Sequence, residues 1–136
     1  MQTQLARKIG PQAETAQAKL PAGRPIDLVH LSRQTLGDRA LEIELLGLFE
    51  KQAGQIIARL GSGLCGSDSK WRNDLAHTLK GSARAVGAMR VAAAAENYEN
   101  SLNAGAGHGE IAQRVGELKA AVEEARQCIL DLLADA

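Results

Sequence analysis

Apolar residues recur at three- and four-residue steps along most of the chain from residue 26 onward, which is the spacing of amphipathic helices. The segment 38–60 shows this clearly, with apolar residues at Leu41, Leu45, Leu48, Phe49, Ile56 and Leu60. A second clear stripe lies near the C-terminus, at Val115, Leu118, Val122, Ala125, Ile129 and Leu132. No segment alternates apolar and polar residues with period two over a useful length. The pattern therefore predicts helices and no strands.

Capping residues and glycines set the expected limits of five helices. Asp27 and Asp38 are the expected N-caps of the first two helices, and Ser67 or Asp68 is the expected N-cap of the third. Gly87 is expected to separate the third helix from the fourth. The first helix is short and ends at Gly37, and the longer helices are expected over 38–60, 69–86, 88–102 and 110–133.

Four long helices joined by short loops are typical of an antiparallel up-down four-helix bundle. The expected fold class is all-α, with this bundle and the short helix before it occupying residues 26–136. Residues 1–25 are rich in Ala, Gln, Pro and charged residues, and we expect a flexible or irregular N-terminal segment there. The chain is 45% hydrophobic but only 2% aromatic. A core of Leu, Ile, Val and Ala favours packed helices over a β-sandwich.

Charge and cysteine usage narrow the class of protein further. Sixteen basic and sixteen acidic residues give a formal net charge of zero, so the chain lacks the basic surface expected of a nucleic-acid binder. No apolar run approaches the roughly 20 residues of a membrane-spanning helix, and the N-terminus lacks the apolar core of a signal peptide. Cys65 and Cys128 have no short spacing, although spacing alone leaves a disulfide open. We expect two reduced thiols and a cytoplasmic protein.

The segment LAHTLKGSARAVGA, residues 75–88, places a histidine on the polar face of its helix. At about 100° per residue, Lys80, Gly81 and Arg84 lie on the same side as His77. The opposite side, expected to face the core, carries Trp71, Leu75, Leu79, Ser82 and Val86. A glycine inside a helix costs roughly 1 kcal/mol relative to alanine. Gly81, one turn after His77, therefore indicates a surface kept bare for a docking partner.

These residues suit phosphoryl chemistry. Imidazole is largely neutral near pH 7 and is then a nucleophile. Lys80 lies three residues from His77 and would pair with an anion on the ring, and Arg84 adds a second cation one turn further. Phosphoryl transfer depends on positioning and charge neutralisation more than on covalent machinery. We interpret the exposed imidazole, the lysine and the bare glycine as a landing site for a phosphoryl group.

The stretch HTLKGSARAVGA, residues 77–88, resembles the signature of histidine-phosphotransfer (HPt) domains. That signature is matched here by His77, Leu79, Lys80, Gly81, Ser82 and Gly87, and the resemblance covers about residues 26–135. It implies a phosphohistidine carrier in a multistep two-component phosphorelay. His77, phosphorylated on Nε2, would take a phosphoryl group from the aspartate of one receiver domain and pass it to another.

The resemblance also implies partners and roles. The partners would be response-regulator receiver domains and a (hybrid) histidine kinase. The receiver would supply Mg²⁺ and most catalytic groups, so no cofactor of this chain's own is expected. Lys80 would support the phosphoryl group and Gly81 would admit the receiver. Arg84 lies where many relatives have a small or amide residue, and its role stays open between charge neutralisation and partner choice.

Other interpretations fit parts of the sequence. No Gly-rich nucleotide-binding segment follows a strand, so ATP-dependent kinase activity is not expected, and neither is an attached receiver. A helical adaptor that binds a receiver or kinase without carrying phosphate would show much the same polar face. A metal or haem bundle is disfavoured, because no ligand partner stands at helical spacing on an inward face beside His30, His77 or His108.

Two smaller expectations concern individual positions. His30 is expected at the third position of the first helix, and His108 in the loop before the last helix. On the helix over 38–60, a row formed by Ile43, Gly47 and Gly54 is either part of a partner surface or a loosely buried edge.

Overall fold

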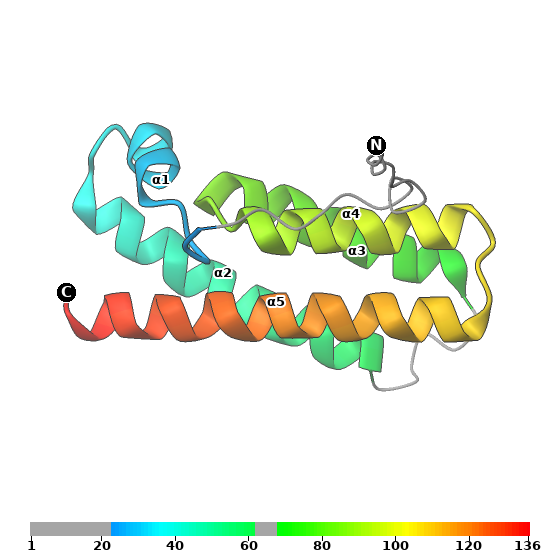
Figure 1. Ribbon diagram of the computed structural model, residues 1–136. Coiled ribbons are helices and arrows are strands. Elements are labelled where there is room, and N and C mark those ends of the chain that lie inside the picture. Colours follow the sequence, from blue (N-terminus) through cyan, green and yellow to red (C-terminus); the bar gives the residue numbers. More distant parts are fainter. Residues whose placement is uncertain (1–22, 62–67) are drawn as a thin grey trace, which may run out of the picture.

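The computed structural model describes residues 23–61 and 68–136, which form five α-helices and no strand (Figure 1). The helices are α1 (Leu28–Thr35), α2 (Arg39–Gly61), α3 (Ser69–Val86), α4 (Met89–Asn103) and α5 (His108–Ala134). The predicted all-α class, with one short helix before four long ones, is confirmed. Residues 1–22 of the N-terminal segment that we expected to be flexible lie outside the described residues. So do Cys65 and Ser67.

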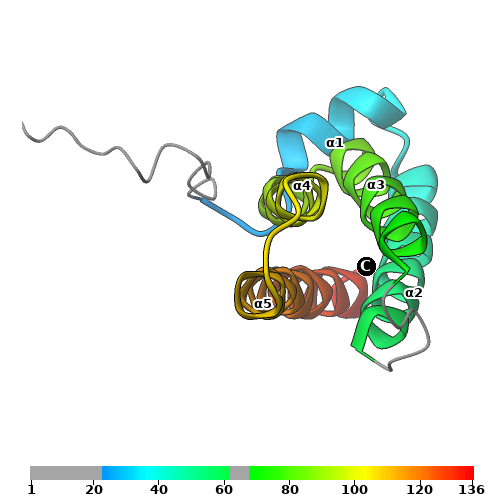
Figure 2. The same ribbon diagram turned by 90° about the vertical axis from the view of Figure 1, so that its right-hand side faces the viewer.

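The four long helices pack in a ring. The helix α3 lies between α2 and α4, and α5 lies on the other side between the same two helices, as the end-on view of Figure 2 shows. Residues 87–88 join α3 to α4, and residues 104–107 join α4 to α5. Such short connections force consecutive helices to run antiparallel. The helix α1 packs across α2 and α3. The expected up-down bundle is therefore the observed one.

Side-chain caps begin three of the helices where the sequence predicts them. A carboxylate oxygen accepts a backbone N–H from the residue three positions on at Asp27, Asp38 and Asp68, each over 3.1 Å. His30 is the third residue of α1, as expected. The expectation for His108 was wrong, because α5 begins at His108 rather than at Glu110. The sequence does not mark the start of α5, because the N-cap residue is Gly107 and no side chain caps the helix.

Gly87 shapes the corner between α3 and α4. Its φ of +84° lies in the left-handed region that favours glycine. The Asp27 N–H donates to the Gly87 carbonyl over 2.8 Å, and a Cβ on Gly87 would lie 2.6 Å from the Asp27 carbonyl oxygen. The bare glycine therefore both ends α3 and lets the start of α1 dock against the corner.

The core is aliphatic, and alanine-rich where α3 meets α4. Ala76 and Ala83 on α3 and Ala92 and Ala95 on α4 are all buried. Small side chains allow two helices to approach closely, and the long side chains of a neighbour then fill the remaining space. Tyr98 is fully buried, and its hydroxyl accepts a hydrogen bond from Arg72 Nη1 over 3.2 Å.

Several residues expected in the core are exposed. Trp71 is 38% exposed and Leu48 is 58% exposed, Leu41 is exposed as well, and Ser82 is only half-buried. On α3 the buried stripe consists of Leu75, Ala76, Leu79, Ala83 and Val86. The stripe is turned toward the alanines because α3 packs closely on α4. A helical wheel that gives most weight to large apolar residues places the centre of the buried stripe too close to Trp71 and Ser82.

The row formed by Ile43, Gly47 and Gly54 on α2 lies in two different environments. A Cβ on Gly54 would lie 3.0 Å from Cζ of Arg126, which belongs to α5. The Nε and Nη2 atoms of Arg126 donate hydrogen bonds to Glu50 Oε2 over 2.9 and 2.6 Å. Gly54 therefore makes room for an ion pair between α2 and α5. At Gly47 a Cβ would meet nothing within 4 Å, and Ile43 is half-buried.

None of the helices within the described residues has the length and apolarity that crossing a membrane requires.

Candidate functional site

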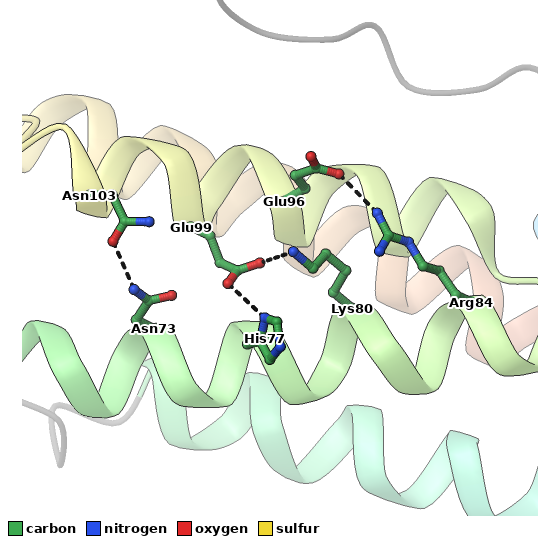
Figure 3. Close-up of polar contacts among 7 residues, drawn as sticks. All are labelled: Asn73, His77, Lys80, Arg84, Glu96, Glu99 and Asn103. Atoms are coloured by element: carbon green, nitrogen blue, oxygen red, sulfur yellow. Dashed lines mark hydrogen bonds and ion pairs between the residues drawn. The ribbon is translucent and has the colours of Figure 1, made fainter.

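His77 lies in the middle of α3, at the seam between α3 and α4. Its side chain is 72% exposed, as the polar face predicted from the sequence requires. The ring is nevertheless not free, because Nδ1 lies 3.1 Å from Glu99 Oε2 of α4 (Figure 3). The contact holds one edge of the imidazole against the neighbouring helix and leaves the edge with Nε2 on the solvent side.

The Glu99 contact determines which ring nitrogen carries the proton of a neutral imidazole. An ionised carboxylate has acceptors and no donor, so His77 Nδ1 donates and Glu99 Oε2 accepts. We assign the tautomer from this partner. In that tautomer the lone pair lies on Nε2. The exposed nitrogen is therefore the nucleophilic one.

Lys80 shares the same carboxylate. Lys80 Nζ lies 2.7 Å from Glu99 Oε1, and the two side chains are only 16% and 10% exposed. A largely buried carboxylate is costly unless a cation or several donors face it. Lys80 and His77 together meet this requirement, one on each oxygen. The ammonium of Lys80 is thus held one turn from the imidazole, on the side facing α4.

Gly81 lies on the exposed surface of α3, next in sequence to Lys80. A Cβ at this position would meet nothing within 4 Å. No packing contact within the described structure therefore calls for a glycine, while the helix carries the cost of one. This is the geometry that the sequence argument for a docking surface requires, and the role itself stays a prediction.

Arg84 is not brought into the His77 cluster. Its Nη2 lies 3.1 Å from Glu96 Oε1 of α4, with side chains 55% and 48% exposed. An ion pair this exposed contributes about 0–1 kcal/mol to stability. The Arg84 carbonyl oxygen also lies 2.7 Å from His30 Nε2 of α1, a contact in which the ring nitrogen is the donor. Arg84 therefore marks the point where α1 meets α3, and its guanidinium already has an acidic partner.

The seam between α3 and α4 carries polar pairs at successive turns. Asn73 Nδ2 donates to Asn103 Oδ1 over 2.8 Å, followed along the seam by the Glu99 cluster and the Arg84–Glu96 pair (Figure 3). Sequence reasoning missed Glu99. A signal was present, because Glu99 lies four and seven residues after Ala95 and Ala92, on the stripe of α4 that faces another helix. A carboxylate on such a stripe calls for a cationic partner across the seam.

The histidines of the described chain do not converge on a metal site. His30 contacts a carbonyl oxygen and His77 contacts Glu99. No group of three or more His, Cys, Asp or Glu side chains among residues 23–61 and 68–136 is placed to hold a metal ion. Cys128 is a half-buried free thiol on α5.

Comparison with known proteins gives the family. The family model described as "Hpt domain" matches residues 44–128, which is more than half of the 136 residues. The chain therefore belongs to the Hpt domain family, whose members are phosphotransfer carriers of two-component signalling. The match includes all of α3 and α4, and hence the seam with His77; α1 lies before it. No curated protein and no solved structure matches the chain.

Proposed function

We propose that His77 is a phosphoryl carrier in a multistep two-component phosphorelay. The observation that carries the proposal is the exposed imidazole whose Nδ1 faces Glu99, so that the Nε2 lone pair points outward. In the forward step this lone pair attacks the phosphorus of a receiver's aspartyl phosphate. The P–O bond to the aspartate breaks, the carboxylate leaves, and a P–Nε2 bond forms. Transfer to the second receiver reverses these events with a new aspartate as the nucleophile.

The residues around His77 suit an anionic group on the ring. Lys80 Nζ is held on the α4 side of the imidazole by Glu99. A cation beside the ring lowers the energy of a phosphoryl group through charge neutralisation. We therefore propose that Lys80 supports the phosphoryl group. Arg84 is the less direct candidate, because its guanidinium contacts Glu96 and not the carboxylate of Glu99 that contacts His77, and its proposed role is selection among partners.

The surface beside His77 suits a docking receiver. Gly81 leaves a bare patch on α3. Leu48 of α2 is 58% exposed, and it lies two residues, or about 200° around the helix, from Glu50. Because Glu50 contacts α5, Leu48 lies on the side of α2 that faces away from α5. An exposed leucine and a bare glycine are both features that supply apolar contact area to a partner.

The proposed partners are response-regulator receiver domains and a (hybrid) histidine kinase. The Mg²⁺ and the acidic groups of the reaction would belong to the receiver, and the carrier would bring the imidazole, the lysine and the docking surface. A carrier operates where the receivers and the catalytic part of the kinase are, and the expected cytoplasmic location follows from this role.

Transfer from a labelled receiver tests the proposal. Receivers charged with acetyl phosphate are mixed with the purified protein, and label on the carrier is followed with time. The His77→Gln variant is expected to take up no label while circular dichroism shows intact helices. His108→Gln is the matched control, since His108 is an exposed histidine in the first turn of α5, and it is expected to be labelled normally. Binding of a receiver without any labelling of the wild type would instead support the adaptor interpretation.

A further inference from the structure

The ion pair between Arg84 and Glu96 lies one turn along the α3–α4 seam from the Lys80–Glu99 pair. Arg84 Nη2 lies 3.1 Å from Glu96 Oε1. We propose that Glu96 is a positioning residue that acts through Arg84. It competes with the phosphoryl group on His77 for the Arg84 guanidinium, and so keeps the phosphohistidine ready to transfer. This inference rests on the proposed function and concerns how strongly the carrier retains its phosphoryl group.

The first step of the argument is that the Arg84 guanidinium lies toward His77. Arg84 comes seven residues after His77, so the helical repeat returns it to nearly the same side of α3, about 10 Å further along the axis. Long side chains of a helix extend toward its N-terminus, which for Arg84 is the direction of His77. Figure 3 shows this side chain running back along α3 toward Lys80 before it meets Glu96. The guanidinium therefore lies closer to the imidazole than the backbone of Arg84 does.

The second step concerns the charges that a phosphoryl group meets. Between His77 and the end of α3, the two basic residues are Lys80 and Arg84, and each faces a carboxylate of α4. Each positive charge is thus already matched by a negative one. A phosphoryl group on Nε2 carries about two negative charges near neutral pH. It therefore gains the full attraction of either cation only by competing with a carboxylate.

The third step is that the two pairs differ in how firmly they hold their cation. The side chains of Lys80 and Glu99 are 16% and 10% exposed, whereas those of Arg84 and Glu96 are 55% and 48% exposed. An exposed pair is weak and exchanges easily. A guanidinium also presents two parallel N–H donors to a phosphoryl group. Arg84 is therefore the cation that is free to turn to the phosphoryl group once Glu96 no longer engages it.

The consequence for transfer follows from the movement of charge. In onward transfer a receiver aspartate attacks phosphorus, the P–Nε2 bond breaks, and its electron pair returns to Nε2. The phosphoryl charge leaves with the receiver. A guanidinium bound to the phosphoryl group stabilises the carrier before this step and loses that contact after it. By engaging Arg84, Glu96 withholds this stabilisation and shifts the equilibrium toward the phosphorylated receiver.

The first measurement needs no receiver. Phosphoramidate can label a histidine directly, since its P–N bond breaks, ammonia leaves, and a P–Nε2 bond forms. Nitrogen-15 NMR then follows the Nε–H signal of Arg84 before and after labelling. We expect phosphorylation to shift this signal clearly more in Glu96→Gln than in the wild type, because the released guanidinium turns to the phosphoryl group. Equal shifts in the two proteins would overturn the proposed competition.

The second measurement is the equilibrium distribution of label between the carrier and one receiver. Glu96→Gln is expected to shift it about three- to fivefold toward the carrier, the upper part of the range for an exposed ion pair. In an Arg84→Ala background, the same substitution is expected to shift it by less than about 1.5-fold, because no guanidinium is left to release. Glu123→Gln is the matched control, since it removes an exposed glutamate beside Arg126 on α5, and it is expected to leave the distribution unchanged.

The outcomes separate this inference from the function on which it rests. An equal effect of Glu96→Gln with and without Arg84 would mean that only the lost negative charge matters, and would overturn the role of Glu96 even if His77 carries phosphate. An unchanged distribution in Glu96→Gln would do the same. A wild type labelled by neither phosphoramidate nor a receiver would overturn the carrier function, and this inference with it. Circular dichroism checks that each variant is folded, which is expected because the substituted side chains are exposed.

Discussion

Replacing Gly81 by alanine separates the stability of the bundle from its proposed docking function. The added Cβ would meet nothing within 4 Å, so no clash opposes it. Alanine is favoured over glycine inside a helix by roughly 1 kcal/mol, since glycine loses more backbone entropy on folding. The Gly81→Ala variant is therefore expected to be more stable by about 1 kcal/mol. For a domain of this size, that corresponds to an increase of about 3–5 °C in Tm.

The same methyl group is expected to impair transfer from a receiver. A methyl group in a close interface displaces the partner or forces repacking, with typical costs of about 1–3 kcal/mol, which is a slowing of about 5- to 150-fold. Labelling by phosphoramidate, a small molecule, is expected to be unchanged. The assays are thermal unfolding followed by circular dichroism, and the initial rate of labelling from each donor.

Gly116→Ala is the matched control for this experiment. Gly116 is also an exposed helical glycine with nothing within 4 Å of a Cβ, but it lies on α5. It is expected to raise Tm by a similar amount and to leave transfer from a receiver unchanged. The reasoning fails if Gly81→Ala gains stability and still accepts phosphate from the receiver at the wild-type rate. A loss of stability in Gly81→Ala would refute the open environment assigned to this glycine.

Three further substitutions have definite expectations. Gly87→Ala is expected to lower the free energy of unfolding by about 2–4 kcal/mol in urea denaturation, because φ is +84° and the Cβ would lie 2.6 Å from the Asp27 carbonyl oxygen; a neutral result would contradict the strain argument. Lys80→Ala is expected to cost about 1–3 kcal/mol, because Glu99 loses its contact of 2.7 Å, and to slow labelling from both phosphoramidate and receivers. Labelling of Lys80→Ala at the wild-type rate would remove Lys80 from the site. Arg84→Ala is expected to change stability by less than about 1 kcal/mol and to change transfer from some receivers but not from phosphoramidate; slowing with the small donor would place Arg84 at the phosphoryl group instead.

Much of the fold could be predicted from local sequence because its determinants are local. The carboxylates of Asp27, Asp38 and Asp68 cap helices through a backbone N–H only three residues away. The left-handed conformation at Gly87 likewise follows from the position of a glycine after a helical segment. Short connections between long amphipathic helices then leave few arrangements besides an antiparallel bundle.

The three side chains around the proposed acceptor could also be found from the sequence. His77, Lys80 and Gly81 lie within four residues of one another on one helix, so the helical repeat alone determines that they share a surface. Their exposure in the bundle follows from the apolar stripe on the opposite side of α3. What the repeat does not determine is how far the helix is rotated about its axis, and for this reason Trp71 was wrongly expected to be buried.

Only the tertiary structure decided the partners of that surface. Glu99 is 22 residues from His77, and its meeting with His77 and Lys80 depends on the register and rotation of α4 against α3. Close packing of alanines sets both, and no local preference specifies them. The same holds for Arg126, which lies over Gly54 from 72 residues further along the chain. Helical periodicity determined the face that carries the histidine, and packing between helices determined which nitrogen of its ring is exposed.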